Sequence, residues 1–257
     1  MIVSHCQAST GLLECMNTRQ QTNNILIENR EGNTQAMMDS QGFDAWAENY
    51  DDTVVRSNSV GEYPFAAYTE VLDEVYQQVR QAPGLSILDM GFGTGTLTAR
   101  FYAEGFEITG IDFSTEMLAK AKVKMPQAKL YHAGFSELPT DIFNWKYSSI
   151  IFTYSIHHLG YNQQYSLIKQ LVPLLEEGGA VVIGDVMTAT TEDMALARKR
   201  DSEQWDDEEF YPVVQTFQDA FPQMTVGFIR KSYCSGVLVM RVKQTVKPEE
   251  NKPRNDG

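Results

Sequence analysis

The chain has 257 residues, a formal net charge of −13, and 42% hydrophobic residues, a composition typical of a globular protein with a sizeable core. No apolar run approaches the roughly 20 residues that a membrane-spanning helix needs. An acidic surface repels the phosphates of nucleic acid and of anionic lipid. We therefore expect a small molecule as the partner, with no nucleic acid and no membrane.

The two ends of the chain differ in composition from the middle. Residues 1–40 are rich in Asn, Gln and Thr without a sustained period, and predict a disordered leader. Residues 244–257 are polar, with two prolines, and predict a flexible tail. This leaves one domain over 41–243. The first residues lack a secretory signal, and three scattered cysteines indicate reduced thiols, so we expect a cytoplasmic protein.

Within this domain, strand patterns alternate with helix patterns. The expected helices are 63–81, 95–105, 114–125, 162–179 with a break near Pro173, and 195–210, and the expected strands are 85–91, 107–112, 128–134, 147–155, 180–187, 225–233 and 236–244. Repeated strand–helix units with continuous apolar strands predict an α/β fold with helices on both faces of a seven-stranded, mostly parallel sheet. The last two strands are expected to form an antiparallel hairpin at one edge.

A glycine-rich loop follows the first expected strand, in "SILDMGFGTGTLTARF" (86–101). Gly91, Gly93 and Gly95 alternate with other residues there, and Asp89 precedes them. Glycine is used where the backbone turns sharply or lies against a ligand, and parallel sheets bind ligands at the carboxyl ends of their strands. The alternative is a tight turn that binds nothing.

Asp112 ends the second expected strand. A carboxylate at this position can accept hydrogen bonds from the two ribose hydroxyls of an adenosine. The alternative is a cap for the helix that follows, but Ser114 already supplies one. We expect this carboxylate at the open edge of the sheet, where it contributes little to packing.

The glycine spacing distinguishes between adenosine cofactors. A dinucleotide G-x-G-x-x-G motif that begins at Gly91 would have Thr96 as its sixth residue, which disfavours an NAD-dependent oxidoreductase. The observed D-x-G-x-G-x-G motif from Asp89 to Gly95 resembles motif I of class I S-adenosylmethionine-dependent methyltransferases. "FDAWAENYDDTV" (43–54) and "FTYSIHHL" (152–159) are similar to segments of the YrrT-like small-molecule methyltransferases.

The resemblance implies a Rossmann-like class I methyltransferase fold and S-adenosyl-L-methionine as the cofactor. The cofactor-binding residues that it implies are Asp89, Gly91, Gly93, Gly95, Asp112, Gly134, Phe135 and Tyr50. Gly134 stands where the family has an Asp, so a hydrogen bond to the adenine amine worth ~1 kcal/mol is missing. Phe135 can stack on the ring. Tyr50 is expected to close over the methionine end, or else to belong to the buried face of a helix.

Methyl transfer requires that acceptor, methyl group and sulfur lie in line, away from water. His157 and His158 end the fourth expected strand, where alternation allows at most one to face the pocket. His157 is the candidate general base, and a structural role for both histidines stays open. No metal is expected, because no nearby Cys or carboxylate has ligand spacing. Trp205 and Tyr211 are candidate substrate-side aromatics.

The predicted function is methyl transfer from S-adenosylmethionine to a small-molecule acceptor that the sequence does not identify. The alternative is a non-catalytic protein that binds S-adenosylmethionine or S-adenosylhomocysteine. The Gly134 substitution is the feature that keeps this alternative open.

Overall fold

The structure is a computed structural model that describes residues 61–243. The predicted leader (1–40), the predicted tail (244–257) and Tyr50 lie outside the described residues. In 61–243, no helix is long and apolar enough to cross a membrane.

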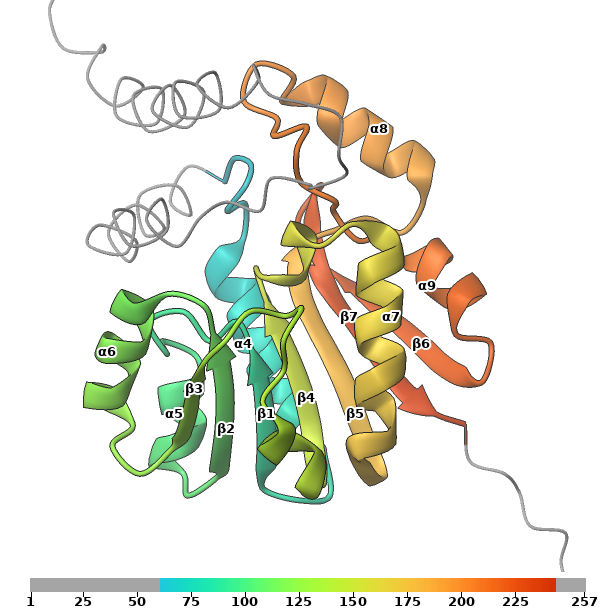
Figure 1. The fold of residues 1–257 in the computed structure, drawn as a ribbon. Helices are drawn as coiled ribbons and strands as arrows, with labels where there is room; N and C mark the ends of the chain where they lie inside the picture. Colours follow the sequence, from blue (N-terminus) through green and yellow to red (C-terminus); the bar gives the residue numbers. More distant parts are fainter. Residues whose placement is uncertain (1–60, 244–257) are drawn as a thin grey trace, which may run out of the picture.

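The strands of the described residues form one seven-stranded sheet in the order β3-β2-β1-β4-β5-β7-β6 (Figure 1). Their bounds are Ser86–Met90 (β1), Glu107–Asp112 (β2), Lys129–His132 (β3), Tyr147–Thr153 (β4), Leu175–Val186 (β5), Met224–Arg230 (β6) and Ser235–Val242 (β7). The first five pair in parallel, and β7 is antiparallel to both β5 and β6. The predicted sheet and its antiparallel edge hairpin are confirmed. Strand order reverses between β1 and β4, so the carboxyl ends of these two strands flank a switch point where such sheets bind ligands.

The helices lie on both faces of the sheet (Figure 1). Their bounds are Tyr68–Arg80 (α4), Thr98–Ala103 (α5), Thr115–Lys124 (α6), Tyr161–Leu171 (α7), Thr191–Arg200 (α8) and Val214–Ala220 (α9), with short 3₁₀ turns at Thr140–Asn144 (η1), Ile156–His158 (η2) and Val172–Leu174 (η3). Successive strand residues point to opposite faces. In β1, Ile87 therefore joins the apolar cluster under α4, α5 and α6, whereas Leu88 joins the cluster under α7 and α9.

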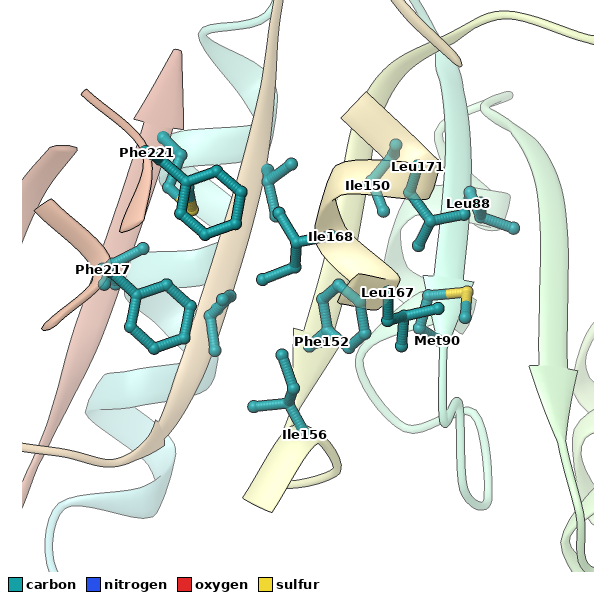
Figure 2. Close-up of a cluster of buried hydrophobic side chains, with 14 of the residues drawn as sticks. Leu88, Met90, Ile150, Phe152, Ile156, Leu167, Ile168, Leu171, Phe217 and Phe221 are labelled. Carbon is teal, nitrogen blue, oxygen red and sulfur yellow. The ribbon is translucent and has the colours of Figure 1, made fainter. Parts of the chain in front are cut away.

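The cluster under α7 and α9 holds much of the core (Figure 2). Leu167, Ile168 and Leu171 of α7 meet strand residues such as Phe152, and Phe217 of α9 extends the contact. All five side chains are buried. Burial of each large apolar side chain contributes roughly 1.5–3 kcal/mol to stability. This packing therefore stabilises the strands that flank the switch point.

Two helix predictions differ from the structure. The helix expected over 162–179 ends at Leu171 (α7), and β5 already begins at Leu175. Pro173 lies in the intervening 3₁₀ turn, because proline lacks the amide hydrogen and clashes with the preceding turn. The helix expected over 195–210 lies at Thr191–Arg200 (α8), where the Thr190 side chain accepts a hydrogen bond from the Asp193 amide as an N-cap.

A third cluster covers the carboxyl end of β5, beyond which α8 lies (Figure 1). Its buried members include Tyr63, Val186, Ala197 of α8 and Tyr211. These residues come from distant parts of the chain. They cover the edge of the sheet at which the sequence predicts the site.

Candidate active site

The loop between β1 and α5 places its three glycines in different roles. All have positive φ: 83° at Gly91, 56° at Gly93 and 74° at Gly95. A Cβ at Gly91 would lie 2.5 Å from the Ser155 Cβ, and one at Gly95 would lie 2.9 Å from the Met125 Cε. A Cβ at Gly93 would meet nothing within 4 Å among the described residues. Gly91 and Gly95 thus permit close packing, and Gly93 has no such neighbour within 61–243.

Asp112 reaches this loop from the end of β2. Its Oδ2 accepts a hydrogen bond from the Gly93 amide (2.8 Å), and its Oδ1 accepts one from the Ser114 amide (2.9 Å). Only 5% of the residue is exposed, so the expectation of an open strand end is wrong. Burial raises the pKa of Asp112, and the two amides and His132 partly oppose this shift. Ser114 caps α6 as expected, because its side chain accepts from the Met117 amide.

Asp89 lies beneath the glycine loop and not at its surface, since it is only 1% exposed. Its Oδ2 accepts a hydrogen bond from the Thr98 hydroxyl, and its Oδ1 has no partner among the described residues. Burial raises the pKa of Asp89 to about 7, with a further increase from Asp112 and a partial decrease from Thr98. Asp89 therefore supports the start of α5 from inside the sheet.

Gly134 and Phe135 follow β3 and lie beside the same loop. The Phe135 ring would be 3.4 Å from a Cβ at Gly91, and it meets Phe152 edge to face at 6.2 Å between centroids. Among the residues that the structure describes, a Cβ at Gly134 would meet the Ser136 hydroxyl alone, at 3.9 Å. The predicted residues of three strand ends therefore converge, because Gly91 and Phe135 are neighbours of each other and Asp112 is bonded to Gly93.

His157 stands in η2, the turn after β4. Its Nδ1 lies 2.7 Å from Oδ1 of Asp185, a residue of β5 with no exposed surface. The same Oδ1 accepts from the Val186 amide, and Oδ2 has no partner within 61–243. Burial opposes the charged imidazole, but Asp185 and then Glu209 outweigh it and raise the pKa of His157 to about 9.

His158 belongs to the same cluster. Its Nδ1 lies 3.0 Å from Oε2 of Glu209, and its ring meets that of His157 edge to face at 4.2 Å. Burial and the charge of His157 lower the pKa of His158. The expectation that the two histidines end a strand is wrong, since β4 ends at Thr153 and both residues lie in a 3₁₀ turn, which does not alternate as a strand does.

Asp185 and Glu209 were missed from the sequence. They lie 28 and 51 residues from the histidines that they contact. The local signals available were the polar residue inside the apolar "AVVIGDVM" strand and the acidic run that ends at Glu209.

Aromatic side chains cover this end of the site. Tyr63 stacks on Trp205 at 4.6 Å and meets Tyr211 edge to face at 5.9 Å, and Tyr211 lies 5.5 Å from the His157 ring. Burial raises the pKa of Tyr63 to about 12 and also raises that of Tyr211. Of the two candidate substrate-side aromatics, Tyr211 lies beside His157, and Trp205 and Tyr211 contact each other closely.

Comparisons with known proteins agree with this geometry. A family model described as "Methyltransferase domain" matches residues 87–179. An uncharacterized methyltransferase of Oceanobacillus iheyensis is 33% identical over 209 residues, covering 79% of this chain and 95% of that protein. An uncharacterized methyltransferase of Alkaliphilus oremlandii is 29% identical over 153 residues, covering 60% and 69%.

Solved structures share the fold at low identity. An O-methyltransferase family protein from Burkholderia thailandensis superposes with a TM-score of 0.61 at 11% identity, covering 90% of this chain and 71% of that one. DhpI in complex with SAH superposes with a TM-score of 0.58 at 15% identity, covering 82% and 98%. The fold and the similarity along nearly the whole Oceanobacillus protein lead to one conclusion: the chain belongs to the class I S-adenosylmethionine-dependent methyltransferases.

Proposed function

We propose that this enzyme transfers the methyl group of S-adenosylmethionine to a small-molecule acceptor, with the cofactor along the glycine loop and the acceptor beside His157. The observation that carries the proposal is the hydrogen bond between the Gly93 amide and the Asp112 carboxylate, at a glycine whose added Cβ would meet none of the described residues within 4 Å. The net charge of −13 favours a small acceptor over nucleic acid, and a cytoplasmic location remains part of the proposal.

The residues of the loop fit an adenosine. Backbone amides of Gly93, Ser114 and Phe113 bond to the Asp112 carboxylate. A carboxylate has about four acceptor positions, and we propose that the ribose hydroxyls bind to the acceptor capacity that the amides leave. Phe135 supplies an aromatic face beside Gly91, and the absence of a side chain at Gly134 leaves adenine recognition to backbone groups.

The acceptor side follows from the orientation of His157. When bound, S-adenosylmethionine supplies a methyl group on a positively charged sulfur, which a lone pair of the acceptor can displace. The Asp185 carboxylate holds Nδ1 of His157, so Nε2 is the nitrogen that can meet the acceptor. Only the neutral imidazole can receive the proton that the acceptor loses, and because the pKa of His157 is raised to about 9, this neutral fraction increases as the pH approaches that value. Tyr211 and Trp205 exclude water from this side, which favours a displacement between partly charged groups.

Turnover tests the proposal. The full-length enzyme is incubated with S-adenosylmethionine and a panel of amines, thiols, phenols and carboxylic acids, and release of S-adenosylhomocysteine is measured. We expect acceptor-dependent release with at least one class, and its loss in Asp112→Ala. Tight cofactor binding without release for any acceptor would favour the non-catalytic alternative.

A further inference from the structure

We propose that His157, His158 and Glu209 bind one divalent transition-metal ion, of the Zn²⁺ class, on the acceptor side of the site. One ligand atom from each of the three residues lies within 4.8 Å of the other two. Two imidazoles and one glutamate form a donor set of catalytic zinc sites, which leave a further coordination position for water or substrate. The three residues therefore supply a complete set of protein ligands for such an ion.

The orientation of His157 is an independent observation that points to a ligand. Its Nδ1 is fixed by Asp185, at 2.7 Å, and Asp185 is fully buried and also bonded to the Val186 amide. Histidines that ligate a metal almost always donate their other ring N–H to a carboxylate or carbonyl, which fixes the tautomer and the direction of the ligating nitrogen. Asp185 has this supporting position, and it leaves Nε2 of His157 for the ion.

Charge and access also fit a divalent cation. The carboxylate groups of Asp185 and Glu209 lie 2.7 Å and 3.0 Å from the two rings, an arrangement that favours a cation. The side chains of His157 and His158 are 12% and 27% exposed, so an ion can enter and a fourth ligand can bind. The three proposed ligands come from two chain segments, η2 and the loop before α9.

The inference rests on the proposed function for the location of the acceptor. Ser155, which directly precedes η2, meets Gly91 of the glycine loop, so the ion would lie on the acceptor side of the cofactor loop. It would select acceptors with an oxygen, nitrogen or sulfur lone pair able to coordinate a metal. With Nε2 of His157 bound to the ion, that imidazole would no longer receive the acceptor's proton; the ion would instead lower the pKa of the coordinated acceptor, which would release its proton to water before methyl transfer.

Metal titration of the full-length protein tests the site. The protein is stripped with a chelator and dialysed, and Zn²⁺ and Co²⁺ are titrated by calorimetry, with metal content measured after desalting. We expect one tightly bound equivalent, at least tenfold weaker binding in His158→Ala and in Glu209→Gln, and 10–100-fold weaker binding in Asp185→Asn. The matched control is His132→Ala, which removes an exposed imidazole bonded to the Phe113 carbonyl and should retain the ion.

The visible absorption of the Co²⁺-loaded wild type reports four- or five-coordination without any variant, so the test stands even if a variant fails to fold. No bound equivalent in the wild type, or unchanged affinity in both His158→Ala and Glu209→Gln, would overturn the proposal. S-adenosylhomocysteine is titrated into the same stripped samples. Binding of the cofactor product without any metal site would refute the ion and leave the proposed function standing.

Discussion

Replacing Asp112 with alanine should weaken cofactor binding and also destabilise the protein without ligand. In the structure, the Asp112 carboxylate accepts two backbone amides, from Gly93 and Ser114, and is only 5% exposed. The same group is proposed to accept two ribose hydroxyls. The substitution therefore removes bonds that hold the empty loop together with bonds that form only when the cofactor is bound.

The magnitudes follow from these bonds. A hydrogen bond to a charged group is worth about 1.5–3 kcal/mol, so loss of the ribose contacts should weaken S-adenosylmethionine binding by at least roughly tenfold. Two backbone amides lose their acceptor, but the cost of burying a carboxylate is also relieved. We expect a net loss of about 2 kcal/mol in the free energy of unfolding, which lowers the Tm of a domain this size by roughly 4–8 °C.

Calorimetry and thermal unfolding measure the two effects separately. Asp112→Asn should be milder in both, because one acceptor oxygen remains. Glu107→Ala removes an exposed carboxylate at the opposite end of β2 and serves as the matched control, with little effect on either measurement. Wild-type affinity in Asp112→Ala would refute the ribose assignment, and an unchanged Tm would show that the two amide bonds do not hold the loop.

Three further predictions test the site. The folded protein keeps a proton on Asp89 up to about pH 7, whereas the unfolded chain releases it near 3.8. This residue's contribution to stability should therefore fall as the pH rises between these values, by up to about 1.4 kcal/mol per unit. The difference in the free energy of urea unfolding between wild type and Asp89→Asn should follow that decline, and a constant difference would contradict it. Gly91→Ala should lower the Tm more than Gly93→Ala, because a methyl at Gly91 would lie 2.5 Å from a neighbour and one at Gly93 would meet no described residue. Gly93→Ala should mainly weaken cofactor binding. If calorimetry shows weaker cofactor binding in Gly91→Ala than in Gly93→Ala, the result would count against the loop assignment. His157→Ala leaves the fully buried Asp185 carboxylate without its imidazole partner and should lower the free energy of unfolding by about 3–5 kcal/mol. This loss should exceed that in His158→Ala, and equal denaturation midpoints for the two variants would disprove this ranking.

The fold could be predicted from the sequence where the pattern is local. Continuous apolar runs gave the strands, and the glycine loop marked the first strand end. The error at 162–179 arose because Leu175 to Gly179 read as a polar helix end, although the residues belong to β5. A proline inside a helical pattern can break the helix or kink it. Here the pairing of the residues after Pro173 with β4 determines that the helix ends.

The convergence of Gly93 and Asp112, on the proposed cofactor side, was also predictable, since Gly93 follows β1, Asp112 ends β2, and parallel strands end at one edge. The acceptor side was not. Which carboxylates meet His157 and His158 depends on how β5 and the loop before α9 pack against η2, and no local pattern encodes these contacts. The burial of Asp112 was missed for the same reason, because the glycine loop folds over it.

Hydrogen exchange of the full-length protein, with and without saturating S-adenosylhomocysteine, tests most directly where the cofactor binds. Protection of backbone amides reports local stabilisation by a ligand. The account predicts that added protection concentrates in three segments, 91–97, 112–116 and 133–137. No added protection in these segments, or protection confined to α8 and its neighbours, would contradict it.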